Sequence, residues 1–175
     1  MSDNKPVFWS SEKLLSLSAI LISVCTLFVF LYQTNLIRQQ QYKSVYPYLS
    51  IGNYGSQTKN FRYVLENKGI GPAVVKSIKV KHKDRPEFED IATFVIKELS
   101  VVDSITYFYS NISPGRLISP DEKIEIIGNN DGKFSTSEII YDIINDDDLD
   151  IEIIYESIYE ESWKITNASN YPIKE

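Results

Sequence analysis

Residues 66–75 read ENKGIGPAVV and place two glycines and a proline between two strand-like runs. A phosphate-binding loop would need G-x-G-x-x-G running into a helix, or a G-K-[ST] end. Here Gly71 is followed by Pro72 and then by β-branched residues. The stretch therefore predicts a structural turn between two strands, formed by Asn67, Gly69, Gly71 and Pro72. We expect the two glycines to supply backbone angles that are closed to other residues, and Pro72 to fix one more dihedral angle.

Both sides of this turn have strand character. Before it, Phe61, Tyr63 and Leu65 alternate with residues that point the other way, which is typical of a half-buried strand. After it, residues 73–83 continue as a strand whose phase slips between Val75 and Ile78, and this slip predicts a β-bulge. The same signals predict further strands within residues 46–52, 105–112, 119–127, 149–157 and 161–166.

Two segments have helical rather than strand periodicity. Residues 86–99 space their apolar side chains as one face of an amphipathic helix. Ser135 and Glu138 match a capping box that would open a second short helix. The chain is therefore expected to be mainly β over residues 46–175. We predict an antiparallel β-sandwich-like domain, or a small barrel, with two short helical inserts.

The N-terminal part of the chain is apolar enough to enter a membrane. No charged residue occurs between Lys13 and Arg38, and twelve of residues 14–31 are Leu, Ile, Val or Phe. About 20 helical residues cross the hydrocarbon core of a bilayer. A cleaved signal peptide would have a shorter apolar region followed by a small-x-small site, which this stretch lacks. We therefore predict an N-terminal tail over residues 1–13, a transmembrane signal-anchor helix over 14–37 and a helical neck over 38–45.

The residues beside this span suggest an orientation and a way to associate. The N-terminal flank balances two lysines with two acidic residues, whereas Arg38 and Lys43 follow the span with no acidic residue before Glu66. The positive-inside rule then predicts a single-pass protein of a cell inner membrane with a cytoplasmic C-terminal domain. Ala19 and Ser23 form a small-xxx-small pair through which the helix could form a homo-oligomer.

The charge of the chain is unevenly distributed. The formal net charge is −6, which argues against general nucleic-acid binding because phosphate attraction supplies most of that affinity. Residues 59–85 hold eight basic and two acidic side chains, whereas residues 86–175 hold six basic and twenty acidic ones. Lys79, Lys81 and Lys83 fall on one face of a predicted strand. They either protect an edge strand from aggregation or form a surface for anionic headgroups or a small anionic ligand.

The residues that carry most enzyme chemistry are scarce. His82 is the only histidine, and Cys25, the only cysteine, lies in the apolar span. Residues 127–138 fail as a calcium loop because Ile127 would stand at the first ligand position. The acidic run over residues 146–150 is more typical of a solvated loop than of a cation site. We therefore expect no enzyme activity, no metal and no cofactor.

A resemblance extends over about residues 14–80. Its motif is Leu65-x-Asn67-x-Gly69-x-Gly71-Pro72-Ala73, preceded by a glutamine-rich neck and the segment Tyr46-Pro47-Tyr48. This pattern resembles small bacterial membrane proteins with one N-terminal transmembrane helix and a β-sandwich-like domain. The resemblance implies that architecture but no activity, and it brings no catalytic residues.

Two hypotheses of function follow from these features. The first is a non-catalytic recognition domain, anchored in the lipid bilayer through residues 14–37, that binds a protein partner or a small ligand at the membrane. The second is a ligand-gated membrane effector, for example in bacterial defence. In that case the β-domain would sense a phosphorylated or nucleotide signal and the anchor helices would assemble in the bilayer.

Overall fold

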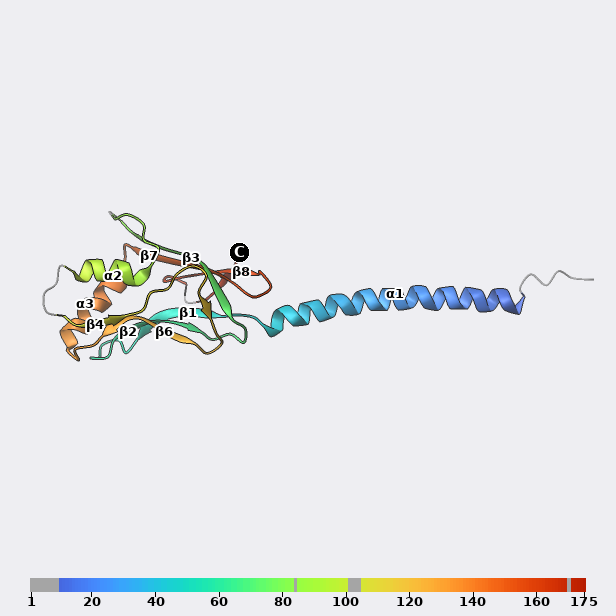
Figure 1. The fold of residues 1–175 in the computed structure, drawn as a ribbon, viewed down its shortest axis with the longest axis horizontal. Helices are drawn as coiled ribbons and strands as arrows, with labels where there is room; N and C mark the ends of the chain where they lie inside the picture. The colour runs from blue at the N-terminus through green and yellow to red at the C-terminus, as the bar shows by residue number, and fades with distance from the viewer. Residues whose placement is uncertain (1–9, 84, 101–104, 170) are drawn as a thin grey trace, which may run out of the picture. The chain divides into compact units, whose positions relative to one another are not determined.

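The fold is described from a computed structural model that covers residues 10–83, 85–100, 105–169 and 171–175. The chain divides into two compact units, Met1–Lys43 and Ser44–Glu175. Figure 1 shows the long helix of the first unit and the β-rich second unit.

The first unit is formed by one helix, α1, which extends over Ser11–Ser44. It is long and apolar enough to cross a membrane, and none of its residues is buried within the chain. Three hydroxyls of the apolar part donate to backbone carbonyls of the helix itself: Ser16 Oγ to Glu12 O at 2.9 Å, Ser18 Oγ to Leu15 O at 2.8 Å and Thr26 Oγ1 to Ile22 O at 2.8 Å. These bonds lower the cost of placing hydroxyl groups in hydrocarbon. The expected neck is a continuation of the same helix.

The second unit contains two antiparallel sheets. The four-stranded sheet has the order β1-β2-β6-β4 and the five-stranded sheet the order β5-β3-β7-β8-β9. Figure 1 shows the two sheets as separate layers, and they do not close into a barrel. The strands are β1 Leu49–Tyr54, β2 Arg62–Asn67, β3 Ala73–His82, β4 Tyr107–Tyr109, β5 Leu117–Ile118, β6 Lys123–Asn129, β7 Leu149–Glu156, β8 Ser162–Thr166 and β9 Ile173–Lys174.

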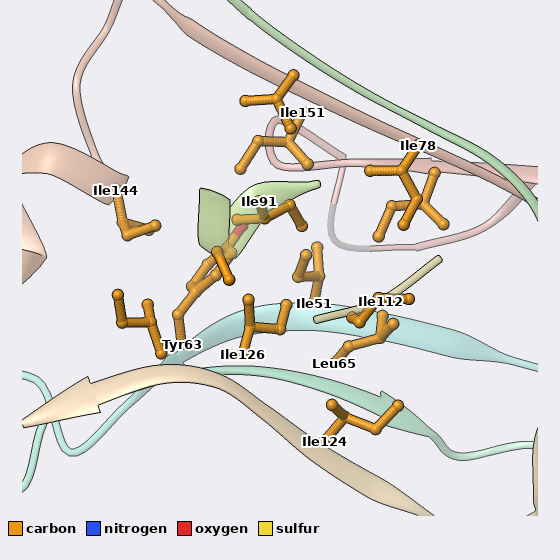
Figure 2. Close-up of a cluster of buried hydrophobic side chains, with 14 of the residues drawn as sticks. Ile51, Tyr63, Leu65, Ile78, Ile91, Ile112, Ile124, Ile126, Ile144 and Ile151 are labelled. Atoms are coloured by element: carbon orange, nitrogen blue, oxygen red, sulfur yellow. The ribbon is translucent and has the colours of Figure 1, made fainter. Parts of the chain in front are cut away.

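One hydrophobic core fills the space between the layers. Figure 2 shows Ile51 and Leu65 from the four-stranded sheet facing Ile78 and Ile151 from the five-stranded sheet. Along β7 buried residues alternate with more exposed ones from Leu149 to Glu156, as the sequence predicts for a half-buried strand. The inward residues are mostly Ile, Val and Leu, whose removal from water supplies the main driving force for folding.

Two helices pack on this core, and α2 begins later than the sequence pattern suggests whereas α3 begins slightly earlier. Helix α2 covers Ile91–Leu99 rather than residues 86–99, because Asp90 caps it by accepting a bond from Thr93 N at 2.8 Å. Before the cap, Phe88 pairs with Val80 as a single β-bridge. Helix α3 covers Phe134–Ile144.

The predicted capping box of α3 is wrong. The residue at the N-cap position is Lys133, and it makes no side-chain cap bond. Ser135 therefore lies inside the first turn, where its hydroxyl is not in position to close the capping box with Glu138. The carboxylate of Asp131 instead accepts bonds from Lys133 N at 2.8 Å and from Thr136 Oγ1 at 2.8 Å, which orders the turn before the helix.

The stretch at residues 66–75 connects the two sheets. It leads from β2 in one layer to β3 in the other, so the turn is a crossover between layers rather than a hairpin. The glycines are needed for a reason other than the predicted one, because neither has a positive φ. A Cβ on Gly71 would lie 1.8 Å from Val45 O, and one on Gly69 would lie 2.3 Å from Tyr48 N. The chain requires glycine here because two backbone segments touch.

Asn67 holds this crossover together. Its side chain is completely buried and accepts bonds from Tyr48 N at 3.2 Å and from Gly69 N at 3.0 Å. Its amide nitrogen donates to Gly71 O at 2.9 Å and to Ile118 O at 3.1 Å. One carboxamide therefore joins the segment before β1, the crossover itself and β5.

The predicted bulge in β3 is confirmed. The pairing of β3 with β7 shifts register between Val75 and Ser77, within the stretch where the sequence phase slips. Strands β5 and β9 were not predicted, and each has only two residues.

The position of the core indicates that the second unit folds without helix α1. Among the described residues, every buried hydrophobic residue of the core lies between Leu49 and Ile165. We expect that deleting residues 1–37 gives a soluble fragment with a cooperative thermal transition, whereas the full chain stays with membranes after alkaline carbonate washing. Release of the full chain by that wash, or a fragment that forms only inclusion bodies, would contradict this expectation.

Adding one methyl group at a glycine of the crossover should lower stability more than adding one at a glycine elsewhere. Gly71→Ala should destabilise that fragment by roughly 2 kcal/mol or more, because the added Cβ meets backbone that cannot move aside. Gly52→Ala is the matched control, since no atom lies within 4 Å of its added Cβ. The control should stay within about 0.5 kcal/mol of the parent. Thermal and urea unfolding measure both, and equal stability of the two variants would refute the close approach.

Candidate functional site

A cleft lies along the outer edge of β1. Its volume is about 760 Å³. One wall is formed by residues 50–53 of β1, and the other by the loop between α3 and β7 together with residues just after β8. Tyr63 of β2 and Ile144 of α3 line it from the core side. We call this site the β1 cleft.

The edge of β1 presents its own backbone to this cleft. Lys68 N donates to Tyr48 O at 2.8 Å, which sets the phase of the hydrogen-bond ladder between β1 and β2. Because the bonding side alternates along an antiparallel strand, the backbone groups of Leu49, Ile51 and Asn53 point away from β2. Leu49 N confirms this direction, since it donates to Tyr155 Oη at 3.3 Å. Ile51 and Asn53 are the next two positions, and both line the β1 cleft.

The opposite wall is a loop fixed by its own hydrogen bonds. Asn145 ends α3, where its side-chain nitrogen donates to Tyr141 O at 2.8 Å and its side-chain oxygen accepts from Asn53 Nδ2 at 2.7 Å. Asp146 Oδ1 then accepts from Asp148 N at 2.8 Å. These bonds connect the loop across the cleft to β1 and hold Asp147 at its margin.

The lining of the β1 cleft is acidic. Asp146, Asp147 and Asp150 are among its lining residues, and no basic residue is. The N–H of Asp148, and to a smaller extent the imidazole of His82, hold the pKa of Asp146 below its usual value. Burial raises the pKa of Tyr63 well above its usual value, so this phenol stays neutral. The site therefore favours a ligand that is positively charged and offers hydrogen-bond groups.

His82 does not line the β1 cleft and is held by its neighbours. Its Nε2 lies 3.6 Å from Asp146 Oδ2, and its ring centroid lies 5.8 Å from that of Phe94 on α2. Its Nδ1 is buried without a hydrogen-bond partner in the part of the chain that the structure describes. These contacts make the only histidine a packed residue at the end of β3, beside the acidic loop.

The three predicted surface lysines lie on the outer face at the end of β3, and the structure brings each beside a carboxylate. The ion pairs are Lys79–Glu152 at 3.6 Å, Lys81–Glu87 at 3.5 Å and Lys83–Asp148 at 3.3 Å. The pairing balances most of the positive charge of this face. Exposed pairs of this kind contribute little to stability, but they compete with any other anion for the same ammonium groups.

The other predicted residues are distributed over both units. Asn67, Gly69, Gly71 and Pro72 lie at the crossover described above, and none of them lines the β1 cleft. Ala19 and Ser23 are exposed on α1, one helical turn apart. Among the described residues, no group of three or more His, Cys, Asp or Glu side chains is arranged to hold a metal ion.

The acidic wall of the cleft could be recognised in the sequence, whereas the wall formed by the edge of β1 could not. The acidic run over residues 146–150 was visible, but its position opposite β1 depends on pairings between distant strands. One signal was available: the strand L-S-I-G-N-Y contains no lysine or proline, the residues that commonly protect an edge strand.

Comparisons of the chain with models of protein families, with curated proteins and with solved structures give no match. The functional conclusion therefore rests on the geometry of the chain itself.

Removing the carboxylates that pair with Lys79, Lys81 and Lys83 should change how strongly the protein binds anionic lipid. The soluble fragment should bind vesicles that contain anionic lipid only weakly, because its lysines are already paired. Replacing Glu87 and Glu152 with Gln, and Asp148 with Asn, frees these lysines and should strengthen binding roughly tenfold or more, at ~1 kcal/mol per lysine near a lipid surface. Vesicle co-sedimentation measures the change. Unchanged binding would leave the lysines as protection of a strand edge.

Proposed function

We propose that this chain is a membrane-anchored recognition module that binds a protein partner without catalysis. Helix α1 would hold it in a cell inner membrane as a single-pass anchor, and the two sheets would serve as a β-sandwich-like scaffold. The observation that carries the proposal is the β1 cleft, in which the outward backbone of Ile51 and Asn53, without a hydrogen-bond partner among the described residues, faces an acidic loop.

The chemistry of the cleft favours binding over reaction. Its polar groups are backbone amides, side-chain amides, carboxylates and the hydroxyls of Ser50 and Tyr63, and these groups recognise a ligand by hydrogen bonds and charge. A catalytic centre would need a nucleophile or a base positioned by a partner. The only histidine is packed against Phe94 and paired with Asp146, which supports a structural role for it.

The domain would lie on the cytoplasmic side. Support comes from Arg38 and Lys43, which follow the apolar span within the last two turns of α1, whereas the N-terminal flank has no net positive charge. A reporter fused to the C-terminus that is active only in the periplasm should stay silent, and activity of that reporter would contradict the orientation.

Site-specific photo-crosslinking in intact membranes tests the recognition function. A photoreactive residue in place of Ala168, which is exposed at the β1 cleft, should give a discrete crosslinked product. The same residue in place of Ser135, which is exposed on α3 outside the cleft lining, should give none. Asp147→Asn should reduce the product at Ala168 at least threefold, because it removes a charge from the cleft.

The control for that variant is Asp148→Asn, an identical charge change at the next residue. Asp148 pairs with Lys83 and does not line the cleft, so its replacement should leave crosslinking unchanged. Equal products at Ala168 and Ser135, or no product at Ala168, would reject the β1 cleft as the recognition site.

A further inference from the structure

We propose that the partner enters the β1 cleft as an extended segment rich in lysine or arginine and adds to β1 as a fifth strand of the four-stranded sheet. This inference rests on the proposed recognition function and specifies its mode. The four-stranded sheet would grow at its β1 edge, where backbone hydrogen bonds give affinity and alternate side chains give specificity.

The backbone of β1 is suited to this pairing. Ile51 and Asn53 direct their N–H and C=O groups away from β2, into the cleft that they line. Asn53 is exposed, so an incoming strand would reach its N–H and C=O first, whereas Ile51 is only 3% exposed and its backbone is largely covered. An incoming strand would satisfy these groups in the same way that Tyr155 Oη satisfies Leu49 N at the start of β1.

The other sheet edges are less open, which singles out β1. Strands β5 and β9 have two residues each and β4 has three, whereas β1 has six. The outer side of β3 is occupied by β5 at Ala73 and Val74 and by the Phe88 bridge at Val80. Short length and covering segments are the usual means by which an edge is closed to other chains.

The charge of the cleft selects the kind of segment. Asp147 lines the cleft without an ion pair among the described residues, whereas Asp150 stands opposite Lys81 in the pairing of β7 with β3 and Asp146 lies 3.6 Å from His82 Nε2. An incoming strand that carries ammonium or guanidinium groups would supply a counter-charge to Asp147 and add to those of the other two carboxylates. A strand with acidic side chains would meet like charges, which are strongly unfavourable across an interface.

Defined peptides test the mode directly. The probe is a fluorescent, end-capped peptide of about eight residues in which lysine alternates with threonine, added to the full chain in lipid nanodiscs. We expect binding by fluorescence anisotropy, and at least tenfold weaker binding of the same peptide with glutamate in place of lysine. N-methylation of alternate backbone amides on the pairing edge should remove binding, whereas methylation of the other edge should preserve it, because only one edge of a strand pairs with β1.

Two pairs of variants locate the binding. Asn53→Pro removes an N–H that points into the cleft and leaves the ladder to β2 intact, so it should weaken lysine-peptide binding at least fivefold. Asn53→Ala, which keeps that N–H and loses only the side-chain bond to Asn145, is its control. Asp147→Asn should weaken binding at least threefold, and Asp148→Asn should not.

The outcomes separate the mode from the function. No binding of the lysine peptide at about 1 mM, equal binding of the glutamate peptide, or equal binding of both N-methylated forms overturns strand addition. If the crosslink at Ala168 persists in that case, the cleft recognises its partner in another way and the proposed function stands. Loss of both results rejects the proposed function together with its mode.

Discussion

The carboxamide of Asn67 is the constraint on which the arrangement of the β-rich unit depends. A buried amide is costly unless each of its donors and acceptors is satisfied, and this one has four backbone partners. Its own N–H donates to Glu122 O, and its C=O accepts from Asp121 N. A single residue at the end of β2 thereby fixes the segment before β1, the crossover to the second sheet and the turn before β6.

That constraint also positions the β1 cleft. Tyr48 N is bound to the Asn67 side chain, so β1 begins at a fixed place and in a fixed register against β2. The register decides which backbone groups of β1 face outward. Tyr155 covers the first of these groups through its hydroxyl, and the edge stays open only farther along the strand. The crossover therefore influences the cleft although none of its residues lines the cleft.

The sequence predicted the elements whose signal is local. The alternation in β7 and the phase slip in β3 mark a strand and a bulge because side-chain direction repeats every two residues. The two-residue strands β5 and β9 leave no such pattern, since they exist only through pairing with β3 and β8. For the glycines at the crossover, the predicted location of the turn is correct, but the predicted reason, a positive φ, is wrong. The backbone that they touch, Val45 beside Gly71 and residues 46–48 beside Gly69, is far away in sequence, so the steric contact could not be read locally.

The same limit applies to the site. The acidic run was evident, but its place opposite Asn53 depends on a bond between residues 92 positions apart. Short-range patterns report which face of a strand is buried and leave open which strand ends at the edge of a sheet. Sheet order, and with it the open edge of β1, required the three-dimensional structure.

An exposed sheet edge carries a hazard for the molecule that displays it. Two copies could join their β1 edges and begin a continuous intermolecular sheet, which is a common start of aggregation. In such a pair the acidic loops beside the two edges would be brought together, and their carboxylates would repel each other. The loop over residues 145–148 can thus act as a gatekeeper that keeps an available edge from pairing with its own kind.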